Sequence, residues 1–344
     1  MKALICGAGI AGLALANRLH HHGWDVLVVD HAGGPRDQGY MIDFFGPGFE
    51  ALAAMGLEPA LRKAASDVDE FRYIDDRGRT TVSVDYALFA RALGGRIASV
   101  MRPALERMLR EALPAGVELR YGTTIDAIGD DEAVLSDGTA VDADLVVGAD
   151  GIHSRVRSLA FGPEPEYLRD LGMHTSAYVF TDPEMHDAVR GRFLLTETLR
   201  RQMGFYDLGD DRVAVFTVHR TDDPALPADP REAIRREYAG MGDLADRALD
   251  RCPPPEEVYY DQVAQIELPR WTNGRTVLIG DAAHAVSLIA GQGASLGVAG
   301  AYLLAERLRR SASSGGLPGM VAVMVLRTAS RSAPEVVASM TAVS

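Results

Sequence analysis

The sequence has little cysteine. Only Cys6 and Cys252 occur in its 344 residues, far apart and without a CxxC or a Cys/His pair at metal-ligand spacing. This usage disfavours a disulfide framework and a zinc site, and it is typical of a reducing compartment. We therefore expect a cytoplasmic protein with no bound metal.

The sequence also lacks a long apolar run and an excess of basic residues. No stretch approaches the roughly 20 apolar residues that span a bilayer, and residues 1–12 carry a glycine loop where a secretion signal would have its cleavage site. The net charge of -13 repels polyanions, so neither nucleic acid nor membrane is an expected partner. The length and the 47% hydrophobic content are enough for two domains.

A strand, a glycine loop and a helix open the chain. Residues 3–6 and 26–29 are apolar runs typical of buried strands, and 10–22 has helical periodicity, which together make a unit of βαβ size. The segment Gly7-Ala8-Gly9-Ile10-Ala11-Gly12 between the first strand and the helix matches GxGxxG. This context favours a dinucleotide-binding loop.

Each glycine of this loop has a physical task. Gly7 permits the tight turn, Gly9 lets a pyrophosphate approach the backbone, and Gly12 lets the helix pack closely on the strand. The helix N-terminus adds amide donors for phosphate, and Asp30 ends the second strand where it can accept hydrogen bonds from an unphosphorylated ribose. The alternative is that the glycines only shape a turn and Asp30 is a solvated acid. The motif alone does not separate FAD from NAD.

The rest of the chain alternates helical and extended patterns. Between 163 and 270 alternating strands predominate, with a proline-rich stretch at 224–230, which indicates a second unit built on a sheet. Helical patterns are predicted at 44–65, 103–113 and 294–309. Short strands are predicted at 71–85, interrupted by a turn at Asp76-Arg77-Gly78, and further strands at 117–121, 133–136, 140–147, 177–180, 203–206, 213–218 and 276–279, with 145–148 returning to the main sheet. Asp137-Gly138 predicts a hairpin turn between two of these strands.

Two further motifs each follow a predicted buried strand. One is Gly148-Ala149-Asp150-Gly151-Ile152-His153-Ser154-Arg155-Val156-Arg157, and the other is Gly280-Asp281-Ala282-Ala283-His284 followed by Gly291-Gln292-Gly293. With the N-terminal loop, these motifs resemble the class A flavoprotein monooxygenases, the p-hydroxybenzoate hydroxylase family that includes tetracycline-inactivating enzymes. The resemblance covers roughly residues 1–310.

The resemblance implies an α/β fold in which a Rossmann-like FAD-binding domain carries an inserted, sheet-based substrate domain. The FAD domain would comprise 1–70, 100–162 and 271–310, and the substrate domain 71–99 and 163–270. Residues 311–344 do not resemble the family's long C-terminal helix, and we expect a poorly ordered or loosely docked tail. Ser287-Leu288 replace family prolines, and Ser295 and Gly300 replace Asn and Asp, which puts substrate positioning in doubt more than FAD binding.

The resemblance also implies which residues hold FAD. Asp281 would bond the ribityl and pyrophosphate region, Arg102 would contact the flavin, and the amides of 291–293 would face its N1 and C2 carbonyl, where negative charge collects on reduction. The complete expected set is Gly7, Gly9, Ala11, Gly12, Asp30, Arg36, Arg102, Asp150, Gly280, Asp281, Gly291, Gln292, Gly293 and Ala294.

The segment from Asp150 to Arg157 matches a family motif implicated in both FAD and NAD(P)H binding. Arg155 and Arg157 are suited to bidentate phosphate contacts. For Arg157, a salt bridge on a helix surface is an equally good interpretation, because an isolated arginine on a helix is usually solvated.

The implied reaction is hydroxylation of an aromatic or polycyclic small molecule with NAD(P)H and O2. Hydride would pass to flavin N5, and oxygen would be transferred through a C4a-hydroperoxide, so no protein nucleophile is needed. Candidate bases are His174, His219, Tyr178 and Tyr206, although packing roles are commoner for such residues. The expected pocket residues are Met41, Asp43, Tyr178, Met203, Phe216 and Leu288. The protein would be a monomer or a homodimer.

Other readings remain open. A flavin-dependent reductase or oxidase of the same fold would oxidise NAD(P)H without inserting oxygen, and a non-catalytic FAD-binding accessory protein is the non-enzyme reading. An NAD dehydrogenase leaves the second and third motifs unexplained. A flavin halogenase is disfavoured because Trp24 and Trp271, the only tryptophans, cannot form its WxWxIP motif.

Overall fold

The computed structural model describes residues 1–35, 39–287 and 290–313. The expected site residues Arg36 and Leu288 and positions 314–344 of the predicted tail lie outside the described residues. No helix within the described ranges is both long and apolar enough to cross a membrane.

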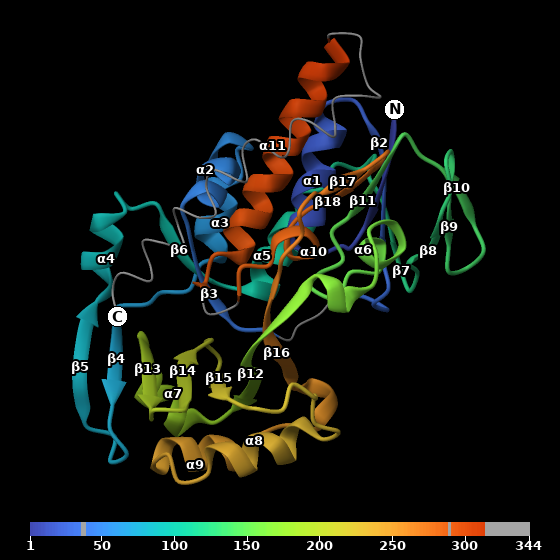
Figure 1. The fold of residues 1–344 in the computed structure, drawn as a ribbon. Helices are drawn as coiled ribbons and strands as arrows, with labels where there is room; N and C mark the ends of the chain where they lie inside the picture. Colours follow the sequence, from blue (N-terminus) through green and yellow to red (C-terminus); the bar gives the residue numbers. More distant parts are fainter. Residues whose placement is uncertain (36–38, 288–289, 314–344) are drawn as a thin grey trace.

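A six-stranded sheet brings together segments from both ends of the chain (Figure 1). Its strands lie in the order β17, β18, β11, β1, β2 and β7, and all neighbours are parallel except β17 and β18. The strands are β1 (Lys2–Cys6), β2 (Asp25–Asp30), β7 (Glu118–Tyr121), β11 (Leu145–Gly148), β17 (Thr272–Asn273) and β18 (Thr276–Leu278). Because the carboxyl ends of parallel strands share one edge, the loops after β1, β11 and β18 meet there.

Both faces of this sheet are covered. Along β1, Ala3 and Ile5 pack into the core under the helices, whereas Leu4 and Cys6 pack into a second core on the opposite face. The first face carries α1 (Ile10–His21), α2 (Pro47–Ala54), α3 (Glu58–Ala64), α5 (Arg102–Glu111) and α11 (Gly293–Ser313). The second carries α6 (Arg155–Ala160), α10 (Asp281–His284) and a small antiparallel sheet of β8 (Ile125–Ile128), β9 (Glu132–Leu135) and β10 (Ala140–Asp142).

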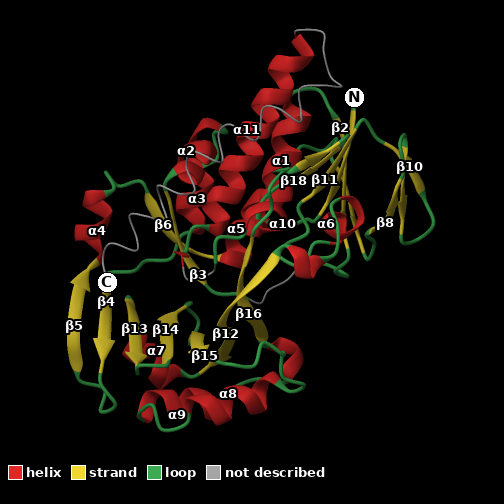
Figure 2. Ribbon diagram, viewed as in Figure 1, coloured by secondary structure: helices red, strands yellow, loops and turns green. Residues whose placement is uncertain are grey.

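A seven-stranded sheet forms the other half of the molecule (Figure 2). Its order is β16, β12, β15, β14, β13, β4 and β5, antiparallel except between β13 and β4. The strands are β4 (Glu70–Ile74), β5 (Thr80–Asp85), β12 (Leu168–Thr181), β13 (Arg192–Glu197), β14 (Arg201–Asp207), β15 (Arg212–Arg220) and β16 (Tyr259–Ile266). We call its two sides the outer face, covered by α7 (Pro183–Val189), α8 (Pro230–Tyr238) and α9 (Asp243–Asp250), and the inner face, which is turned towards the six-stranded sheet.

Short elements join the two halves. The antiparallel pair of β3 (Met41–Phe45) and β6 (Ile97–Met101), two strands far apart in the sequence, lies between them. The helix α4 (Tyr86–Ala92) follows β5. Two 3₁₀ turns, η1 (Glu164–Glu166) and η2 (Pro255–Glu257), precede β12 and β16. The predicted boundary between residues 99 and 100 falls inside β6.

Most predicted elements are present, with three corrections. The segment 44–65 is not one helix: it begins in β3, and Gly56, with φ of 73°, ends α2 before α3 starts. The segment 140–147 divides into β10 and β11, and β11 returns to the main sheet as predicted. Residues 311–313 are not part of a tail but continue α11, where the Ser311 hydroxyl donates to the Arg307 carbonyl at 3.1 Å.

Candidate flavin site

A cleft lies at the carboxyl edge of the six-stranded sheet, closed on its far side by β16 of the seven-stranded sheet. The loops after β1, β11 and β18 all open into it, as their motifs predict. The expected FAD residues that line it are Gly7, Gly9, Ala11, Asp30, Arg102, Asp150, Gly280, Asp281, Gly291, Gly293 and Ala294. Gly12 and Gln292 are not among the residues that line the cleft.

The N-terminal loop has the geometry of a phosphate cradle. Gly7 has φ of 111°, and a side chain there would strike the backbone of Ala149; a side chain at Gly12 would strike the Gly7 carbonyl oxygen. A Cβ at Gly9, in contrast, would meet nothing within 4 Å. Among the described residues no side chain caps α1, so its first amides face the cleft as free donors.

Asp30 is fixed at the end of β2 by the same loop. One carboxylate oxygen accepts the Ala8 N–H at 2.8 Å, and the other accepts the Ala32 N–H at 2.8 Å. Each oxygen keeps a further acceptor position. Because the side chain borders the cleft, a ribose hydroxyl can be bound there.

The third motif places an acid and a helix start on the opposite wall. Asp281 begins α10, and a Cβ at Gly293, where α11 begins, would lie 3.4 Å from the Asp281 carboxylate. Gln292 is 7% exposed, and its amide nitrogen has no hydrogen-bond partner among the described residues. The Gln292 side chain lies beside Gly46, where α2 begins, and not among the cleft residues, so Gly291 and Gly293 are the residues of this motif that border the cleft.

Aromatic side chains and Arg102 border the cleft near the seven-stranded sheet. Arg102 begins α5, and its guanidinium lies 3.7 Å from the Glu106 carboxylate. The backbone amide of Arg102 donates to the Tyr40 carbonyl at 2.9 Å. The Tyr40 ring lies 6.0 Å from that of Tyr259, and burial raises the Tyr40 pKa to about 12, so its hydroxyl stays protonated. Sequence reasoning missed Tyr259 and its neighbour Asp261, because no motif marks β16.

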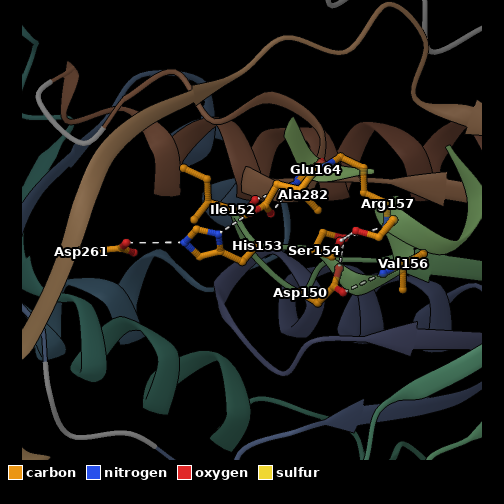
Figure 3. A network of polar contacts seen from close by, with 10 residues as sticks. Asp150, Ile152, His153, Ser154, Val156, Arg157, Glu164, Asp261 and Ala282 are labelled. Carbon is orange, nitrogen blue, oxygen red and sulfur yellow. Dashed lines mark hydrogen bonds and ion pairs between the residues drawn. The ribbon is translucent and has the colours of Figure 1, made fainter. Parts of the chain in front are cut away.

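The segment after β11 folds back on itself rather than presenting its arginines to the cleft (Figure 3). Asp150 accepts the Ser154 hydroxyl at 2.6 Å and the Val156 amide at 3.1 Å, and burial raises its pKa. Ser154 caps α6 by accepting the Arg157 amide at 2.9 Å. The acid thus lines the cleft while it also fixes the loop.

Arg157 was expected either to contact a phosphate or to form a salt bridge on a helix surface, and its position fits neither. The side chain is fully buried and donates to the carbonyls of Ile152 at 2.7 Å and Ala282 at 3.1 Å and to the Glu164 carboxylate at 2.8 Å. It therefore lies neither on a helix surface nor among the cleft residues. Arg155 points elsewhere, towards the Ile125 carbonyl and Asp126, and also does not line the cleft.

Four of the expected pocket or base residues lie on the outer face of the seven-stranded sheet, away from the cleft. Tyr178 and Met203 belong to the core under α7, α8 and α9, and the Tyr178 hydroxyl donates to the Ala248 carbonyl. His174 and His219 are buried on the same outer face, where His219 pairs with Tyr238 at 3.0 Å. Alternate residues of a strand point to opposite faces, so these four turn away from the cleft.

Tyr206 and Phe216 lie on the inner face. The Tyr206 hydroxyl accepts the Met41 amide of β3 at 2.6 Å, and the Phe216 ring lies 5.4 Å from that of Tyr40. The expected pocket residues Met41 and Asp43 do not line the cleft, whereas their neighbours Tyr40 and Ile42 do. Asp43 instead accepts the Ser99 hydroxyl at 2.5 Å, and burial raises its pKa.

Comparisons with known proteins agree with this geometry. The family model of the FAD binding domain matches residues 1–318. An uncharacterised protein of Mycobacterium tuberculosis is 30% identical over 334 residues, 89% of this chain and 84% of its own length. The flavin-dependent monooxygenase eupH of Phoma sp is 31% identical over 344 residues, 90% of this chain and 77% of its own.

Among solved structures, the tetracycline destructase Tet(55) superposes with a TM-score of 0.78 at 25% identity, over 90% of this chain and 81% of its own. The glycine loop and Asp30 fit a flavin dinucleotide, and the comparisons agree with this fit. The chain belongs to the FAD binding domain family and, within it, to the class A flavin-dependent monooxygenases.

Proposed function

We propose that this FAD-dependent monooxygenase uses NAD(P)H and O2 to hydroxylate an aromatic or polycyclic molecule, bound between the flavin and the inner face of the seven-stranded sheet. The inner face carries the observation that supports this most directly. Phe71, Phe193 and Tyr206 are cross-strand neighbours on β4, β13 and β14, with ring centroids 5.6 and 5.3 Å apart.

On the neighbouring strand β15, Phe216 lies beside Tyr40, and of these rings Tyr40 and Tyr259 line the cleft. Tyr206 is 1% exposed and is bonded to β3, so it supports this aromatic surface from behind. Gly204 leaves room for the Phe193 ring, since a Cβ there would lie 2.9 Å from it. Offset and edge-to-face stacking makes such a surface a good partner for a planar ring system. Tet(55) is named a tetracycline destructase, and tetracyclines are polycyclic.

The protein's contribution to the reaction is placement. When bound, the flavin supplies the redox chemistry with oxygen. The residues of the chain would hold its phosphates at Gly7–Gly12, its ribose at Asp30 and its ring near Arg102 and Gly291. The aromatic surface then orients the substrate ring, and the closely packed inner face limits the access of water.

We also propose that the two sheets correspond to a FAD domain and a substrate domain, joined through β3 and β6. No motif for a second dinucleotide domain occurs in the sequence, so NAD(P)H would visit the cleft transiently.

Oxygen incorporation tests the proposal. The purified holoprotein should oxidise NADH or NADPH faster when a matching phenol from a panel of polycyclic phenols is added, and the product should contain one atom from ¹⁸O2. Phe216→Leu should raise KM for that phenol, whereas Met203→Leu, a similar change on the outer face, should leave it unchanged. NAD(P)H oxidation that never yields an oxygenated product would instead identify a reductase or oxidase.

A further inference from the structure

His153, in the motif that follows β11, links the flavin-binding half of the molecule, built on the six-stranded sheet, to the seven-stranded sheet. Its Nδ1 lies 3.0 Å from the Glu164 carboxylate of η1, and its Nε2 lies 3.5 Å from the Asp261 carboxylate of β16. Figure 3 shows the ring between these two acids. A histidine that donates from both nitrogens is the charged imidazolium.

The two acids are themselves held in place. Glu164 also accepts the Arg157 guanidinium at 2.8 Å, which ties it to α6. Asp261 accepts the Gln262 amide at 2.8 Å and the Tyr259 hydroxyl at 3.5 Å. The charges therefore alternate along one line: Arg157, Glu164, His153 and Asp261, with Tyr259 at its end.

The end of this line is a wall of the flavin cleft. Residues 261–264 of β16 and Tyr259 line the cleft opposite the glycine loop. β16 is the edge strand of its sheet, so it has a neighbouring strand, β12, on one side only. At the end of β16, the Ile266 amide donates to the Ala285 carbonyl at 3.0 Å. At its beginning, the contact of Asp261 with His153 is the one that joins the strand to the motif after β11.

We propose that His153 is a positioning residue for FAD: as an imidazolium it holds Asp261, and with it the β16 wall, against the cofactor cleft. When His153 loses a proton, one of its two nitrogens can no longer donate, and the ring no longer carries a charge that attracts the Asp261 and Glu164 carboxylates. β16 can then move away from the cleft. FAD is then held less tightly.

The charge of His153 sets the pH range of the effect. Donation to the Asp261 carboxylate, despite the cost of desolvation, and further donation to the Glu164 carboxylate raise the His153 pKa from 6.5 to about 9. The charged groups that face the ring are Glu164 of η1 and Asp261 of β16, with Arg157 of α6 behind Glu164. His153 therefore keeps its charge in the folded protein until pH rises through about 9, so its attraction for Asp261 is present below that pH and is lost above it.

The first experiment measures FAD affinity of the full chain between pH 6.5 and 10, by the change in flavin fluorescence on binding. Because His153 is half-exposed, we expect the wild-type dissociation constant to rise about fivefold through pH 9. His153→Gln should show this weaker affinity already at pH 7 and no step near pH 9. His21→Gln, an exposed histidine on α1, should behave as wild type.

Two more variants separate positioning from a folding defect. His153→Lys keeps a cation and should restore affinity at pH 7, with the fall moved to higher pH. Asp261→Asn should weaken FAD binding about as much as His153→Gln, and the double variant no more than either single one. Wild-type affinity in His153→Gln at pH 7, or a step near pH 9 that survives in it, would overturn the proposal. These outcomes need no substrate, so they stand apart from the test of hydroxylation.

Discussion

Replacing Arg157 by methionine should destabilise the protein even when no flavin is bound. The guanidinium makes three hydrogen bonds inside the protein, to Ile152, Ala282 and Glu164, and its side chain is fully buried. Methionine fills similar space but leaves two carbonyls and one carboxylate without their donor. This change isolates the polar contribution of the residue.

The expected magnitude follows from the burial of its partners. Removing one member of a buried ion pair costs about 3–5 kcal/mol, because the other charge stays without compensation. Glu164 is 31% exposed, so water recovers part of this loss, and we expect about 3 kcal/mol. Arg155→Met is the matched control: that arginine is 51% exposed, and its loss should cost less than about 1 kcal/mol.

Urea unfolding of both apoproteins, followed by circular dichroism, measures these differences directly. The apo form is used because bound FAD would add its own contribution to stability. If Arg157→Met unfolds within about 1 kcal/mol of wild type but binds NADPH or FAD much more weakly, the buried network is not what the residue maintains. A phosphate-binding role would then be favoured, against the geometry in Figure 3.

Three further changes test other parts of the site. Gly12→Ala should weaken FAD binding more than tenfold in a fluorescence titration, because its Cβ would strike the Gly7 carbonyl and displace the phosphate cradle. Asp30→Ala should weaken it too, and should also destabilise the apoprotein by about 1–2 kcal/mol in urea, since the Ala8 and Ala32 amides lose their acceptor. Glu306→Gln should destabilise the protein at pH 7 but not at pH 2. Burial opposes ionisation of Glu306, yet bonds from Arg18 and His22 lower its pKa to about 2, so its contribution is present above about pH 4.5 and is lost as pH falls through 2. A penalty that persists at pH 2 would contradict this assignment.

The flavin cleft was predictable from sequence because its parts are local. Each motif follows a buried strand, and parallel strands bring their carboxyl ends to one edge, so Asp30, Asp150 and Asp281 meet without any knowledge of the loops between them. Arg157 was not predictable in this way. Its role depends on Glu164 of η1 and on the Ala282 carbonyl, which the chain reaches only after the whole second sheet.

The inner face of the seven-stranded sheet was harder to predict for a different reason. In a sheet with one wet face, polar and apolar residues alternate and reveal which side is buried. Here helices cover one face and the flavin-binding half the other, so Tyr178 and Phe216 stand in similarly apolar strands. What separates them is the pairing register: Ala177, not Tyr178, lies opposite Phe216, so the two aromatic rings point to opposite faces. A one-residue slip of β12 would turn Tyr178 to the inner face beside Phe216, so the face to which Tyr178 points, and with it the proposed substrate surface, is set by long-range pairing rather than by any local pattern.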